Sequence, residues 1–119
     1  MKLSEIEELL LVSVLADRER LRTLHPLRWW PGEDRFEWAR LNSLVTDARN
    51  GIVRLDWFAW RGGHCGIAER QQNSRAVRRL ADLELIVRHT SRFGDRQTKA
   101  VELTKSGETV AREIQHILN

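Results

Sequence analysis

The chain has 119 residues, of which 41% are hydrophobic and 31% are charged. This length suits one domain, and this composition supports a buried core, so a disordered protein is a poor interpretation. The single cysteine, Cys65, cannot form an internal disulfide, and the longest apolar run is far shorter than the roughly 18 residues of a membrane span. The first residues lack the features of a signal peptide. We therefore expect a cytoplasmic domain without membrane contact.

Two helices are predicted in the amino-terminal third. The first begins after Ser4, because Glu7 lies at the spacing of a capping box. It ends before a connector with two prolines and two tryptophans, and residues 1–33 comprise this helix and the connector. The second helix spans 34–49 and ends at the stop signal Asn50-Gly51. The apolar stripes are Ile6, Leu9, Leu10 and Val14 in the first helix and Trp38, Leu41, Val45 and Ala48 in the second.

Shorter elements are predicted in the middle of the chain. Ile52-Val53 suits a short strand, and Asp56 suits the cap of a brief aromatic helix that Gly62-Gly63 ends. A longer helix follows over 68–83, with Val77, Leu80, Ala81 and Glu84 on one face.

A hairpin and a final helix are predicted after that. Residues 86–92 and 97–103 are rich in β-branched side chains and read as two strands joined by the turn 93–96. Thr104 is expected to cap the last helix. The expected buried stripe of that helix is Val110, Ile114, Ile117 and Leu118.

Basic charge is concentrated in one part of the chain. Residues 68–99 contain eight Lys and Arg against four Asp and Glu, a net +4, whereas the whole chain carries +3. Nucleic-acid binding requires such a footprint, because Lys and Arg displace the counterions of phosphates. Arg75, Arg78 and Arg79 lie three and four residues apart, so they share one side of a helix whose other side is apolar. An ordinary solvated surface helix is the alternative interpretation of these charges.

The polar residues 71–74 come just before these arginines. Gln72 and Ser74 are side chains of the kind that contact phosphates or bases at the start of a groove-facing helix. The same stretch also suits a loop in which Ser74 caps a shorter helix, and this alternative stays open.

Two segments in the carboxyl-terminal half of the chain resemble a known protein family. Residues 74–88, SRAVRRLADLELIVR, look like the recognition helix and first wing strand of winged helix-turn-helix regulators, especially the MarR-like group. Residues 101–107, VELTKSG, are similar to the second wing strand and the start of the next helix in that family. The resemblance covers residues 66–118. Two features depart from the family pattern: residues 57–66 are short, aromatic and broken by glycines, and Glu84 stands where glycine is usual.

The resemblance implies a mainly α fold with a small β-hairpin, an α+β winged helix-turn-helix with extra terminal helices. A single domain, 1–119, would comprise a winged-helix core over 34–103 and a carboxyl-terminal helix over 104–119. We expect a prokaryotic, archaeal or viral transcriptional regulator that binds double-stranded DNA sequence-specifically, with the 68–83 helix in the major groove and the wing on the backbone or minor groove. DNA contact is carried onto Gln72, Ser74, Arg75, Arg78 and Arg79 in the helix and onto Arg92, Arg96 and Lys99 in the wing.

The terminal helices predict a partner chain. Winged-helix regulators commonly dimerise through terminal helices, and both terminal helices are strongly apolar, so we hypothesise a homodimer. The alternative function is a winged-helix module for protein–protein contact without specific DNA binding. Trp38, Trp57 and Trp60 are expected in the core, whereas Trp29 and Trp30 fit either loop packing or contact with a partner.

The sequence offers no candidate for catalysis. His64 and Cys65 are adjacent, which is a poor spacing for chelating one metal ion, and no second cysteine accompanies them. Neither a phosphate-binding glycine loop nor a carboxylate pair is found. We therefore expect a protein that is not an enzyme and that uses no metal and no cofactor.

Overall fold

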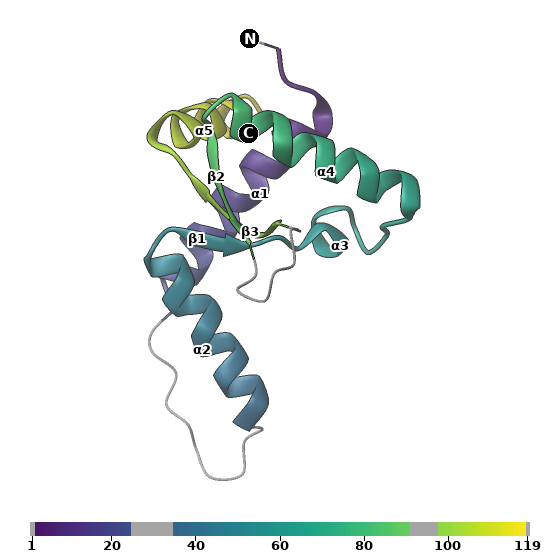
Figure 1. The fold of residues 1–119 in the computed structure, drawn as a ribbon. Coiled ribbons are helices and arrows are strands. Elements are labelled where there is room, and N and C mark those ends of the chain that lie inside the picture. Colours follow the sequence, from purple (N-terminus) through teal and green to yellow (C-terminus); the bar gives the residue numbers. More distant parts are fainter. Residues whose placement is uncertain (1, 25–34, 91–97, 119) are drawn as a thin grey trace.

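The computed structural model describes residues 2–24, 35–90 and 98–118, which form a mainly helical fold with a small antiparallel sheet (Figure 1). Residues 25–34 and 91–97, which include Trp29, Trp30, Arg92 and Arg96, lie outside the described residues. The elements in chain order are α1 (Glu5–Arg22), α2 (Arg35–Arg49), β1 (Ile52–Arg54), α3 (Trp57–Trp60), α4 (Ile67–Asp82), β2 (Ile86–Thr90), β3 (Thr98–Leu103) and α5 (Lys105–Leu118).

The sheet has the strand order β1-β3-β2, and both pairs are antiparallel. Val53 pairs with Val101 in one ladder, and Ile86 pairs with Leu103 in the other. These four side chains are buried, so the register is fixed by the requirement that one face of the sheet covers the core. The short strand and the two longer strands predicted from the sequence are all present within the described residues.

Helix α1 forms the centre of the fold. Its predicted capping box is confirmed, because the Ser4 hydroxyl accepts from the Glu7 N–H at 3.2 Å and the Glu7 carboxylate accepts from the Ser4 N–H at 2.7 Å. α1 lies between α4 and α5 in Figure 1, and its side chains Leu10, Leu11, Val14 and Leu15 are at most 1% exposed. The apolar stripe that the homodimer hypothesis places at a subunit contact is therefore largely buried within the chain.

The start of α5 packs tightly against the segment before β2. The Thr104 hydroxyl accepts from the Gly107 N–H at 3.0 Å, as its predicted cap role requires, and donates to the Glu84 carbonyl at 2.7 Å. A Cβ atom at Gly107 would lie 2.8 Å from the Leu85 carbonyl carbon, so only glycine fits this contact. Thr104 and Gly107 together fix α5 against the sheet.

The predicted buried stripe of α5 is only partly correct. Val110 and Ile114 are half-buried and pack against the core, and Ala111 is fully buried. Ile117, however, is 82% exposed, because none of the described elements covers the last turn of the helix. The side chain of Leu118 lies outside the described residues.

Helix α2 projects away from the rest of the molecule (Figure 1). A second small core holds its carboxyl-terminal half, where Leu21 packs with Val45 and Ala48. Trp38, which the sequence analysis places in the core, is only half-buried. Trp57 and Trp60 are also half-buried but do pack against the main core, with their rings edge-to-face at 5.4 Å.

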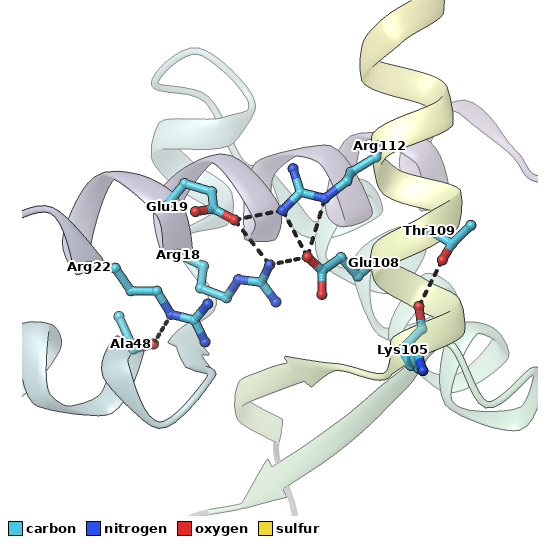
Figure 2. Close-up of polar contacts among 8 residues, drawn as sticks. All are labelled: Arg18, Glu19, Arg22, Ala48, Lys105, Glu108, Thr109 and Arg112. Carbon is cyan, nitrogen blue, oxygen red and sulfur yellow. Dashed lines mark hydrogen bonds and ion pairs between the residues drawn. The ribbon is translucent and has the colours of Figure 1, made fainter.

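An ionic network joins α1 to α5 (Figure 2). The buried Arg18 guanidinium pairs with Glu19 at 3.1 Å and with Glu108 at 2.9 Å. Arg112 contacts the same two carboxylates, at 3.0 and 2.8 Å. Close to this network, Arg22 Nε donates to the Ala48 carbonyl at 2.9 Å and ties α2 to α1.

Candidate nucleic-acid interface

Helix α4 has one buried face and one exposed face. The buried residues Asn73, Ala76, Val77 and Leu80 recur at the three- and four-residue spacing of a helix. On the outer side, the predicted contact residues Gln72, Ser74, Arg75 and Arg78 are exposed. The helix begins at Ile67 after Gly66, so Ser74 lies inside it, and the alternative in which Ser74 caps a shorter helix is wrong.

The exposed residues of α4 form two parallel ridges. Arg70, Ser74 and Arg78 are four residues apart and make the first ridge, while Ile67, Gln71 and Arg75 make the second at the same spacing. Arg70, Arg75 and Arg78 form no ion pair or hydrogen bond with another side chain in the described part of the chain. The outer face of α4 therefore carries three guanidinium groups that are unpaired within the described residues.

Arg79 differs from the other arginines of α4. Its guanidinium donates to the Glu7 carboxylate of α1 and, at 3.1 Å, to the Lys2 carbonyl. The Glu7 side chain is only 3% exposed, whereas that of Arg79 is 49% exposed. The sequence places Arg75, Arg78 and Arg79 on one side of the helix. In the structure Arg75 and Arg78 lie on the outer face, whereas Arg79 belongs to the contact between α4 and α1.

The connection between α3 and α4 is held by residues that the sequence analysis missed. Arg61 donates to the Asn73 side-chain oxygen through two nitrogens, at 2.6 and 2.9 Å, and to the Gln72 side-chain oxygen at 3.3 Å. The Asn73 amide also donates to the Cys65 sulfur at 3.6 Å. Asn73 is 4% exposed and shares the buried stripe with Ala76 and Val77. This spacing is the sequence signal that could have identified Asn73 as an internal hydrogen-bonding residue.

The amino-terminal turn of α4 carries an acidic side chain. The pKa of the Glu69 carboxyl is lowered, chiefly because its own backbone N–H donates to it, with a further contribution from nearby His64. His64 lies 3.6 Å from this carboxylate. A negative charge at this position suits the positive end of the helix dipole.

A cavity of about 700 Å³ lies between the segment 55–58, the sheet and the side of α4 that carries the ridge of Arg70, Ser74 and Arg78. Arg70 and Arg78 of α4 line it, together with Arg88 of β2 and the predicted wing residue Lys99 of β3. Trp57 and Phe58 contribute aromatic rings. Arg70 and Arg88 are absent from the predicted site, although both lie in the basic window 68–99 that the charge count identifies.

Within residues 2–24, 35–90 and 98–118, no cluster of three His, Cys, Asp or Glu side chains is arranged to hold a metal ion. In the same ranges, every helix is too short or too polar to cross a membrane. Comparison of the chain with protein-family models, with curated proteins and with solved structures finds no significant match.

Proposed function

We propose that this chain is a winged-helix transcriptional regulator that binds double-stranded DNA sequence-specifically. In this proposal α4 is the recognition helix and β2 and β3 form the wing. Two features of the architecture support it: α4 is followed directly by the β2–β3 hairpin, and β3 lies between β1 and β2 in the sheet. This order of elements is the one that the sequence resemblance to winged-helix regulators implies.

The observation that carries the proposal is the outer face of α4. An α-helix fits the major groove of B-form DNA, where a guanidinium group contacts guanine O6 and N7 through two hydrogen bonds. Arg75 and Arg78 are exposed on this face and have no partner among the described side chains. The opposite face is anchored by buried Val77 and Leu80, so the helix presents these arginines on a rigid support.

We assign phosphate or base contacts beside these arginines to Gln72, Ser74 and Lys99. Gln72 is exposed, and its side-chain oxygen accepts from Arg61. Arg92 and Arg96 remain predictions of wing contact, since they lie outside the described residues.

Selection of bound duplexes from a random pool tests the proposal. We expect enrichment of a defined sequence, and an affinity for that duplex that falls steeply with salt because phosphate contacts release counterions. Enrichment of no sequence, together with an affinity that salt leaves unchanged, would contradict it.

A protein–protein module is the second candidate function, and exposed apolar side chains favour it. Phe58 is 63% exposed and lines the cavity beside α4, and Ile67, the first residue of α4, is 78% exposed. An interface centred on these side chains would depend little on ionic strength. A steep fall of duplex affinity with salt therefore supports the regulator, whereas a chain that selects no duplex and whose affinity for duplexes does not depend on salt favours the protein–protein module.

A further inference from the structure

The cavity between 55–58, α4 and the sheet contains an unbalanced set of charges. Four basic residues line it, Arg70, Arg78, Arg88 and Lys99, whereas Asp56 is the one acidic residue among the described residues of its lining. The Asp56 carboxylate already accepts from the Ala59 N–H at 3.3 Å as the cap of α3. Cations gathered around one hollow raise its electrostatic potential, so the cavity attracts an anion.

The arginines of this cavity have no carboxylate partner within the part of the chain that the structure describes. Arg70, Arg78 and Arg88 make no ion pair or hydrogen bond with the side chains that the structure describes. Two neighbouring arginines differ, since Arg61 contacts Asn73 and Arg79 contacts Glu7. A guanidinium group binds a phosphate through two parallel hydrogen bonds, which makes phosphate the anion that this set suits best.

Aromatic rings lie in the same cavity. Trp57 is half-buried and has the Arg61 guanidinium 5.9 Å from its ring centre. Phe58 is 63% exposed, which leaves its ring accessible from the solvent. Exposed aromatic rings beside cations stack on nucleobases, and the cavity of about 700 Å³ is within the usual range of small-molecule sites.

We propose that this cavity binds a nucleotide, with its phosphate on Arg70, Arg78 and Arg88 and its base against Phe58. A free mononucleotide and an unpaired nucleotide in a nucleic-acid strand present the same chemistry. The proposed site includes the ridge of Arg70, Ser74 and Arg78 and excludes Arg75, which does not line the cavity. This site is additional to the proposed binding of double-stranded DNA, and nucleotide binding in the cavity does not depend on it.

Calorimetric titration with adenosine monophosphate tests this site without DNA. We expect one nucleotide per chain, at least tenfold weaker binding by Arg88→Ala, and unchanged binding by Arg75→Ala as the matched control. Phe58→Ala should weaken adenosine monophosphate at least threefold and leave inorganic phosphate unchanged, because it removes only the base contact. All three side chains are exposed, so circular dichroism should show an unchanged fold.

A second titration distinguishes the source of the nucleotide. It compares a fully paired duplex with the same duplex carrying one unpaired adenine. If the strand supplies the nucleotide, the unpaired adenine strengthens binding at least threefold, and Phe58→Ala removes this gain. If the free mononucleotide is the ligand, the two duplexes bind equally and adenosine monophosphate binds as above.

The inference is overturned if neither adenosine monophosphate nor the unpaired adenine responds to Arg88→Ala and Phe58→Ala. This failure is distinct from failure of the proposed function. If the chain binds adenosine monophosphate but no duplex, the cavity site is supported and the regulator function is contradicted. If the chain selects a duplex but neither Arg88→Ala nor Phe58→Ala changes the binding of adenosine monophosphate or of the unpaired adenine, the regulator function is supported and the cavity site is contradicted.

Discussion

Glu84 is the only non-glycine residue with positive φ in the described part of the chain, at 60°. This left-handed conformation lies just after α4, where the chain turns into β2, and it brings the Glu84 carbonyl to the Thr104 hydroxyl. A side chain in this region costs on the order of 1 kcal/mol or more, whereas glycine adopts it without a steric penalty. The position is the one where the winged-helix resemblance expects glycine.

Glu84→Gly should therefore stabilise the protein by about 1 kcal/mol in urea unfolding. The carbonyl that accepts from Thr104 belongs to the backbone and is retained. Glu84→Ala is the control, since alanine keeps the Cβ atom and should leave the stability close to that of the wild type. A Glu84→Gly variant less stable than the wild type would contradict this explanation.

The contact between α1 and α4 depends on an ion pair with one buried partner. Arg79→Ala leaves the Glu7 carboxylate, 3% exposed, without its cationic partner. We expect a loss of about 1–3 kcal/mol in the free energy of unfolding, because a buried charged acceptor is left with fewer hydrogen bonds. Arg75→Ala, at an exposed position with no partner among the described residues, should change the free energy of unfolding by less than about 0.5 kcal/mol.

A second substitution separates this electrostatic cause from lost packing. Glu7→Gln in the Arg79→Ala background removes the unpaired charge and should recover part of the loss. If Arg79→Ala is as stable as Arg75→Ala, the ion pair does not contribute to the contact between the two helices.

The network between α1 and α5 predicts a pH dependence. Hydrogen bonds from Arg18 and Arg112 lower the pKa of Glu19 and Glu108 below the ordinary value of 4.5. A carboxyl whose pKa falls on folding stabilises the fold above its unfolded pKa, and this contribution is lost as pH falls through the folded value. As the pH is lowered, the free energy of unfolding should therefore begin to decrease near pH 5 and should continue to decrease below pH 4.5.

Glu108→Gln should flatten this acid dependence in thermal unfolding and lower stability at pH 7 by about 1 kcal/mol or less, since the pair is partly exposed. Glu113→Gln is the matched control on the same helix, because Glu113 is exposed and forms no ion pair within the described residues. Equal pH profiles for the two variants would show that the network does not couple protonation to folding.

Helices and strands were predictable from the sequence because their signals are local. The Ser4 capping box, the Thr104 cap and the inward stripe of α4 all depend on residues within one or two turns. The role of Arg79 was not predictable, since Glu7, its partner, is 72 residues away in the sequence. Helical spacing alone places Arg79 with Arg75 and Arg78.

The cavity was not predictable for a similar reason. Its lining comes from the segment 55–58, α4 and both strands of the hairpin, and only the tertiary fold brings these together. Arg88 belongs to a strand and shares no helical face with Arg78. The sequence locates the basic charge in the window 68–99. It does not show that Arg70, Arg78 and Arg88 line a cavity whereas Arg75 does not.

At the scale of the whole molecule, the homodimer remains a prediction. The fold restricts which apolar side chains are exposed for a contact between two chains. The apolar side chains of α1 are largely buried in the core, whereas Ile117 near the end of α5 is 82% exposed. Sedimentation at micromolar concentration should give a particle of twice 13.9 kDa, and Ile117→Asp should give the monomer. A 13.9 kDa particle for the wild type would remove the homodimer hypothesis.

The claim that the outer face of α4 binds DNA is tested most directly by the duplex affinity of Arg75→Ala/Arg78→Ala. The control is Arg20→Ala/Arg40→Ala, which removes the same charge from α1 and α2. On the selected duplex at moderate salt, each arginine of α4 should contribute about 1–3 kcal/mol, so the double variant loses more than about tenfold in affinity while the control binds almost as tightly as the wild type. Equal affinity of the two double variants would contradict the assignment of α4 as the recognition helix.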